Sequence, residues 1–296
     1  MVGFLLVAPL VVYPMFLMKV MCFALFACAF NLLIGFGGLM SFGHSMFLGT
    51  AAYVSAHAAR QWGLTPELAV LAATAAATGL ALVTGLIAIR RQGIYFAMIT
   101  LALSQMIYFV YLQAPFTGGE NGIQDVPRGR LFGLLDLSST PVLYGYVLCI
   151  FVFGFGLVWR TVHSPFGHVL QAIRENEARA ISLGYDADRY KLLAYVLSGA
   201  LSGLAGGTKA LVFQLATLTD VHWAMSGEVV LMTLVGGLGT LFGPVAGAAV
   251  IVTMQNHLAH LGAWVTVVQG LVFVVCVLAF RRGIVGEIAR LTRRSL

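Results

Sequence analysis

The feature that most limits the fold is a series of apolar stretches, each of about 17 to 25 residues, that recurs along the chain. Lipid offers the backbone no hydrogen bonds, so a segment that crosses a bilayer must be a helix or part of a closed barrel. The apolar runs are continuous and do not alternate with polar residues, which favours helices. A mean hydropathy of +0.93 excludes a soluble globular fold.

We therefore predict an all-α, polytopic membrane protein with about 8–10 transmembrane helices and with glycine-broken or re-entrant segments. The chain of 296 residues is expected to form one transmembrane domain, with a cytoplasmic loop at 161–189 and an outer loop at 113–141. The apolar runs lie near 2–18, 20–37, 39–58, 67–89, 93–112, 142–160, 190–213 and 263–280, and a glycine-broken stretch occupies 228–257.

The positions of lysine and arginine predict the topology. We take 2–18 as the first span and not as a cleavable signal, because it is apolar from its start. If the helices alternate, most cations share one side, which the positive-inside rule assigns to the cytoplasm together with the C-terminus. That side holds Arg90, Arg91, Arg160, Arg174, Arg179, Arg189, Lys191, Arg281, Arg282, Arg290, Arg293 and Arg294, and the other holds Lys19, Arg60, Arg128 and Arg130. Lys209, near the outer end of its run, is expected to extend its ammonium group to the membrane interface.

One polar segment, SPFGHVLQAIRENEARAISLG at 164–184, stands out in the otherwise apolar chain. The pairs Arg174–Glu177 and Glu175–Arg179 have the spacing of ion pairs on one short exposed helix. Its partial apolar stripe is expected to comprise Val169, Ile173, Ala180 and Ile181. The segment is either a helix that docks on a partner protein or a solvated loop helix.

Two glycine-rich stretches are expected to interrupt helices. Because the spans alternate in direction, the segment 228–257 must begin and end on the outer side of the membrane. The sequence GGLGTLFGP at 236–244 could form the turn within a re-entrant pair of helices or between two short spans. The second stretch, 35–49, contains the ionisable residue His44. Irregular backbone at membrane depth must be buried in protein or line a water-filled cavity, so both stretches predict a translocation pathway. The alternatives are close helix packing by the glycines and a packing role for His44. The candidate pathway residues are Gly38, Ser41, His44, Gly236, Gly237, Gly239, Gly243 and Pro244.

A stripe of small residues follows the polar segment, at a spacing of four. Such a stripe lets another helix approach closely within lipid. That helix could belong to this chain or to a partner subunit. The packing residues expected here are Ser198, Gly199, Ser202, Gly203, Gly206 and Gly207.

No motif supports an enzyme. The chain has no GxxxxGK[ST], HExxH, CxxC or GxSxG pattern, and its four cysteines lie in apolar runs without paired spacing, so we expect no metal site, cofactor or disulfide. An intramembrane enzyme using His44 with Ser41 or Ser45 lacks a third partner. The eleven acidic residues all fall in predicted loops or near helix ends, which disfavours coupling to ions through an internal carboxylate. The expected driving force therefore lies outside this chain.

The motifs together resemble the membrane permease subunits of branched-chain amino-acid ABC importers, in particular the LivM-type subunit. The resemblance covers about 31–282 and rests on NLLIGFGGLMSFGHSMFLG, GIYFAMITLALSQM, TGGENGI, the run at 164–207 and EVVLMTLVGGLGTLFGPVAGA. It implies a bacterial inner-membrane protein that works by alternating access. The implied partners are a paralogous LivH-type permease, two cytoplasmic ATPase subunits that bind ATP and Mg²⁺, and a periplasmic substrate-binding protein; no nucleic acid is expected.

The resemblance also implies that the polar segment couples to an ATPase. The coupling residues would be Ser164, Pro165, Gly167, Arg174, Glu175, Asn176, Glu177 and Gly184. The implied cargo is a branched-chain or related hydrophobic amino acid, and the alternatives are urea or another small amide. A stand-alone secondary carrier and a membrane scaffold without transport remain alternatives from other classes.

Overall fold

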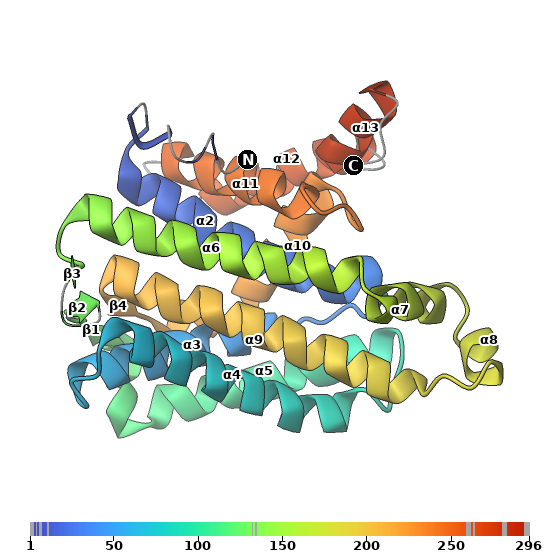
Figure 1. Ribbon diagram of the computed structural model, residues 1–296, viewed down its shortest axis with the longest axis horizontal. Coiled ribbons are helices and arrows are strands. Elements are labelled where there is room, and N and C mark those ends of the chain that lie inside the picture. Colours follow the sequence, from blue (N-terminus) through green and yellow to red (C-terminus); the bar gives the residue numbers. More distant parts are fainter. Residues whose placement is uncertain are drawn as a thin grey trace.

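The computed structural model describes residues 3, 5, 8–10, 12–131, 133, 135–258, 262, 264–279 and 283–292. It confirms the all-α, polytopic membrane fold: long helices lie side by side, and short strands occupy one end of the bundle (Figure 1). Five helices among the described residues are long and apolar enough to cross a membrane. They are Pro14–Phe36, Pro66–Ala88, Ile94–Gln113, Thr140–Val162 and Ala187–Phe213.

In chain order the helices are α2 (Pro14–Asn31), α3 (His44–Arg60), α4 (Pro66–Ala88), α5 (Ile94–Gln113), α6 (Thr140–Val162), α7 (Pro165–Glu175), α8 (Glu177–Ser182), α9 (Ala187–Phe213), α10 (Trp223–Gly236), α11 (Gly243–Leu258), α12 (Trp264–Ala279) and α13 (Gly283–Thr292). A π-helical turn, η2 (Leu32–Phe36), continues α2, and 3₁₀ turns lie at η1 (Ala8–Leu10), η3 (Pro115–Thr117), η4 (Gly119–Asn121) and η5 (Leu218–Asp220). Strand β1 (Ile123–Gln124) pairs antiparallel with β4 (Leu215–Ala216), and β2 (Arg130–Leu131) pairs with β3 (Leu135–Asp136).

The two ends of the bundle differ in their contents. We call the end that carries α7 and α8 the α7 end, and the end that carries the strands the strand end (Figure 1). At the strand end, Arg60 donates to the carbonyl of Gln124, and Arg128, from the predicted outer loop, donates to the carbonyl of Val212. The described cations separate between the two ends as the sequence predicted. Those predicted at 281–282 and 293–294 lie outside the described residues.

The predicted boundary between the first two spans, near residues 18–20, is wrong. A single helix begins at Pro14 and runs through Lys19 into η2. Proline is suited to the first turn of a helix, because its fixed φ matches the helix and its missing N–H would have no partner there. Lysine is a good helix former, so Lys19 marks no break.

Lys209 does not reach the membrane interface as expected. Its ammonium group pairs with the carboxylate of Asp220, in η5, and the side chains are only 14% and 4% exposed. An acidic partner brought close by the turn after α9 keeps the lysine within the protein.

Both predicted helix breaks exist. After η2 the chain is non-helical from 37 to 43, and α3 then begins at His44. Helix α10 ends at Gly236 and α11 begins at Gly243, and the turn between them lies near α7. The chain enters this pair from β4 at the strand end, and α10 begins within the bundle, where the hydroxyl of Ser226 accepts the Ser45 N–H. Helix α11 then runs back toward the strand end (Figure 1).

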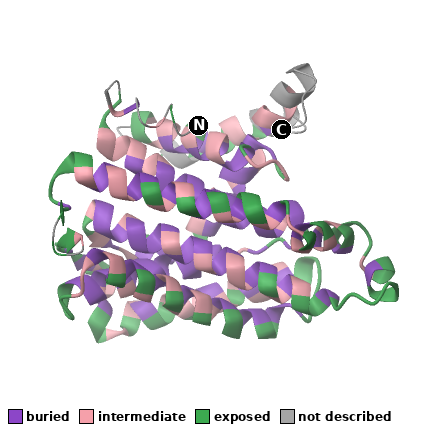
Figure 2. Cartoon of the chain, in the orientation of Figure 1, coloured by how far each residue is buried: buried purple, intermediate pink, exposed green. Residues whose placement is uncertain are grey.

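The small residues of α9 pack within this chain. A side chain built on Gly199 would collide with Ala81, one on Gly203 would lie 2.5 Å from the Cβ of Ala77, and one on Gly207 would lie 3.0 Å from the Cβ of Ala73. The α4 partners repeat every four residues, so two stripes of small residues face each other. Figure 2 shows the result: α9 is mostly buried between its neighbours, whereas α4 and α5 carry exposed residues on their outer faces.

Candidate functional site

The polar segment forms two short helices that extend beyond the ends of α6 and α9 (Figure 1). The hydroxyl of Ser164 accepts the Gly167 N–H at 3.4 Å, and Pro165 occupies the first turn of α7. A side chain on Gly167 would collide with the carbonyls at the end of α6. Gly184 follows α8 with a φ of +92°, a conformation that glycine adopts at little cost. These four predicted residues therefore shape the segment.

The prediction of one exposed helix with two internal ion pairs is wrong. Asn176 separates α7 from α8, with φ −156° and ψ 95°, and its side-chain oxygen accepts the Arg179 N–H at 3.0 Å. Asparagine is a strong N-cap residue, so it starts a new helix where the ion-pair spacing suggested continuity. Among the described residues, Glu175 and Arg179 form no ion pair with each other, and Arg174 and Glu177 bond elsewhere.

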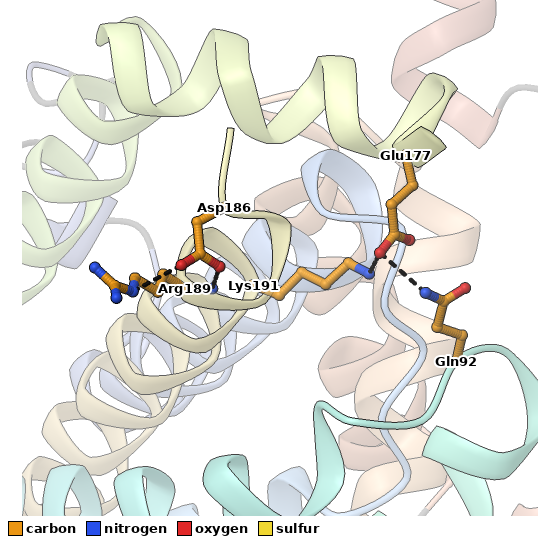
Figure 3. A network of polar contacts seen from close by, with 5 residues as sticks. All are labelled: Gln92, Glu177, Asp186, Arg189 and Lys191. Atoms are coloured by element: carbon orange, nitrogen blue, oxygen red, sulfur yellow. Dashed lines mark hydrogen bonds and ion pairs between the residues drawn. The ribbon is translucent and has the colours of Figure 1, made fainter. Parts of the chain in front are cut away.

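Glu177 connects α8 to the bundle (Figure 3). Its Oε1 lies 2.6 Å from the Nζ of Lys191, in α9, and accepts a hydrogen bond of 2.9 Å from Gln92, in the turn between α4 and α5. Beside this network, Asp186 caps α9 by accepting the Arg189 N–H and pairs with the Arg189 side chain at 2.7 Å. Because Lys191 is buried, this ion pair is shielded from solvent and fixes α8 more firmly than a surface pair would.

The expected apolar stripe of the segment divides into two parts. Ile173 and Ala180 are buried together against Ala187, with Val169 packed beside them. Ile181 points the other way. It forms an exposed apolar surface with two residues that follow α8: Ile181 is 55% exposed, Leu183 72% and Tyr185 41%.

At the first break, Ser41 and His44 are buried and Gly38 is not. Gly38 lines a groove of about 450 Å³ together with Met40, Phe42 and the first turns of α5. The groove is mainly apolar and lies along non-helical backbone. Non-helical backbone next to a cavity was one of the two arrangements that the sequence predicted for a translocation pathway.

His44 has the contacts of a packing residue. Its Nε2 lies 2.8 Å from the hydroxyl of Ser198, which itself donates to the carbonyl of Ala29 at 2.6 Å. Since that hydroxyl has a single proton, Nε2 must carry the hydrogen and donate to Ser198. The ring also makes edge contacts with Phe30, Phe47 and Tyr195. His44 thus holds the start of α3 against α2 and α9.

At the second break, Gly237 and Gly239 have φ values of +123° and +74° and form the turn. A side chain on Gly236 would collide with the carbonyl of Gly243, beside Pro244 in the first turn of α11. The glycines therefore both make the turn and let α10 and α11 cross closely. That this turn lines a translocation pathway stays a prediction.

Four residues of these contacts were not among the predicted site residues: Asn31, Gly35, Gln92 and Lys191. The Asn31 amide bonds the backbone of Gly239 and Thr240, and Gly35 receives the Arg174 side chain. Asn31 is the only carboxamide in α2, which is the one signal that could have marked it. No group of three or more His, Cys, Asp or Glu residues in the described part of the chain could hold a metal ion.

Residues 13–277 match the model of the family described as branched-chain amino acid transport system / permease component. The chain belongs to this family. The high-affinity branched-chain amino acid transport system permease protein LivM of Escherichia coli (strain K12) is 28% identical over 261 residues, which is 80% of this chain and 61% of that protein. The chain thus spans about three fifths of the length of this relative.

Two further relatives are also named as permeases. The ribose import permease protein RbsC of Bacillus subtilis (strain 168) is 31% identical over 195 residues, or 62% of this chain and 58% of that protein. The probable branched-chain amino acid transport permease protein LivH of Methanocaldococcus jannaschii is 28% identical over 137 residues, which is 44% of this chain and 42% of that protein. No solved structure matches the chain. The ribose relative represents a solute class that the sequence motifs had not suggested.

Proposed function

We propose that this chain is the LivM-type permease subunit of an inner-membrane importer for branched-chain or related hydrophobic amino acids. The observation that carries the proposal is the pair α7–α8, which extends from the bundle, is tied to it through Glu177, and displays Ile181, Leu183 and Tyr185 to solvent. Exposed apolar groups outside the membrane indicate a protein interface. The partners would be a LivH-type permease, two ATPase subunits that bind ATP and Mg²⁺, and a periplasmic binding protein.

The distribution of charge supports a cytoplasmic position for the α7 end. Arg90, Arg91, Arg160 and Arg189 all lie there, and short cytoplasmic loops carry an excess of such residues. With this orientation the strand end faces the periplasm and can receive the binding protein. The helix α13 begins beside Gly237, close to the α7 end, which supports the proposal that the C-terminus is also cytoplasmic.

The proposed mechanism is alternating access. Closure of the ATPase subunits would move α7 and α8, and the helices would transmit this motion to the bundle. The non-helical segments at 37–43 and 237–242 supply places where helices can move relative to one another. The groove beside Gly38 is mainly apolar, which suits an aliphatic side chain.

The LivM relative favours amino acids as the cargo, and the ribose relative makes a sugar the second candidate. Urea or another small amide remains a third candidate. A stand-alone secondary carrier would need neither an ATPase nor the apolar surface around Ile181.

Reconstitution tests the proposal. The chain is combined with a LivH-type permease, ATPases and binding protein from the same source, and ATP-dependent uptake of leucine, ribose and urea is measured in proteoliposomes. Leu183→Glu should reduce ATPase binding and leucine uptake at least about tenfold, because it places a charge in an apolar interface. Leu183→Met, which keeps an exposed apolar side chain at the same position, is the matched control. Uptake without ATP, or full uptake by Leu183→Glu, would contradict the proposal.

A further inference from the structure

We propose that Arg174 and Asn31 are positioning residues that couple α7 to the turn between α10 and α11. Together with Gly35, Gly239 and Thr240 they form a continuous polar connection, which we call the relay. The inference rests on the proposed docking role of α7 and extends it into the bundle. It assigns the relay as the route by which motion of α7 reaches the second helix break.

The first contact of the relay joins α7 to the end of α2. The guanidinium of Arg174 donates to the carbonyl of Gly35, in the π-helical turn η2. Carbonyls at the end of a helix lack partners within it, and a cation there is favoured by the helix dipole. A side chain on Gly38 would lie 2.8 Å from the Cγ of Arg174, so this glycine leaves room for the arginine stem. Leu170 packs beside Gly37 and keeps α7 close to the same turn.

The second contact joins α2 to the turn at 237–242. The side chain of Asn31 donates from Nδ2 to the carbonyl of Thr240 at 2.9 Å, and its Oδ1 accepts the Gly239 N–H at 3.1 Å. Only one orientation of the amide satisfies both bonds. Asn31 is 1% exposed, so water could not replace either partner.

The two contacts share Gly35. A side chain on Gly35 would collide with the Asn31 amide and lie 2.7 Å from the Gly239 nitrogen. The carbonyl of the same residue accepts from Arg174. Helix α7, the end of α2 and the α10–α11 turn are therefore held at a single point.

The turn itself is internally braced. The hydroxyl of Thr240 donates to the carbonyl of Gly237 at 2.8 Å and accepts the Gly243 N–H, the first of α11, at 3.1 Å. Displacing Asn31 would leave buried polar groups of this turn without partners, which is costly. The turn and α11 should therefore follow α2 when α7 moves.

The alternative is that Arg174 only caps α2, as a local contact. Hydrogen–deuterium exchange on the purified chain in nanodiscs distinguishes the relay from a local cap. If the relay exists, Arg174→Met should speed exchange both at 33–40 and at 236–243. The expected increase is about tenfold or more, because the variant loses a hydrogen bond from a charged donor. Arg174→Lys should recover part of the protection. Arg91→Met, an exposed arginine at the same end, should change neither segment. An effect confined to 33–40 would overturn the proposal.

A double-mutant cycle in the reconstituted transporter gives a functional test. Arg174→Met and Asn31→Leu should each lower the number of substrate molecules imported per ATP hydrolysed, while ATPase binding is retained. If both act in one relay, the double variant should lose no more than the more defective single variant. Losses that multiply would contradict the relay. Absence of ATP-dependent uptake in the unaltered complex would instead refute the proposed function, and the exchange result would still decide the relay.

Discussion

The ammonium group of Lys209 is paired with the carboxylate of Asp220 and lies 5.5 Å from the centre of the Phe23 ring. Glu228 interacts electrostatically with both members of the pair, and Lys19 interacts with Glu228 and Lys209. Helices α2, α9 and α10 thus contribute to one charged cluster near the strand end. Within a mostly apolar bundle, this cluster fixes where the turn after α9 meets the helices.

Removing one partner of this pair should destabilise the protein strongly. Lys209→Met or Asp220→Asn leaves one buried polar group uncompensated, at a cost of about 3–5 kcal/mol. The double variant Lys209→Met/Asp220→Leu removes both charges and should recover most of the loss. Thermal unfolding in detergent measures the effect, with Arg130→Met as an exposed control. Additive losses in the double variant would show that the two residues act separately.

The sequence predicted this fold well where the signal was local. Apolar length predicted the long helices apart from the boundary near 18–20, which falls inside α2, and glycine content located both breaks. The sequence-based prediction failed where a contact depends on how the chain folds back, as for Lys209, whose partner Asp220 is brought close by the turn after α9. Arg174 and Glu177 have the spacing of an ion pair, yet Asn176 ends the helix between them, and their partners are Gly35 and Lys191. Such pairings depend on helix packing, which spacing along one segment does not report.

The facing stripes of α9 and α4 make a prediction about folding. Gly203→Leu should destabilise the chain itself by at least about 1–3 kcal/mol, because any side chain there meets Ala77. Loss of complex assembly would follow from this. Gly79→Leu is a matched control, since that glycine of α4 has open space around it. Yield and thermal stability of the chain alone measure the effect; normal stability of Gly203→Leu would show that the helices separate easily.

His44 should matter for stability more than for transport. His44→Ala leaves a cavity among Phe30, Phe47 and Tyr195 and should cost about 2–5 kcal/mol. His44→Phe keeps the packing and loses one hydrogen bond, at about 1 kcal/mol, since Ser198 retains Ala29 as its acceptor. Uptake by His44→Phe at a temperature where it is folded should be near normal. Abolished uptake in a stable His44→Phe protein would restore this residue to the pathway.

The hairpin β2–β3 should loosen in acid. The Ser138 backbone N–H donates to the Asp136 carboxylate at 2.8 Å, and this bond lowers the pKa of Asp136 below its usual value of 3.8. A lowered pKa in the folded state means that the stabilisation is present above pH 3.8 and is lost as the pH falls through the lower, folded-state value. Exchange protection of the Ser138 amide, compared with Asp136→Ala at each pH, tests this. Equal protection in the two proteins at pH 6 would refute it.

Gly239 tests whether the turn between α10 and α11 serves transport. Its φ of +74° is strained for residues with a side chain, least for asparagine and most for β-branched residues, while a Cβ there would meet only atoms at 3.4 Å or more. Gly239→Val should therefore disturb the backbone without a steric clash, and abolish uptake while the complex still assembles. Gly239→Asn should retain most uptake because asparagine tolerates this conformation. Equal uptake by the two variants would mean that the backbone of this turn is not part of the transport cycle, whereas loss of assembly in Gly239→Val alone would make the turn a structural element only.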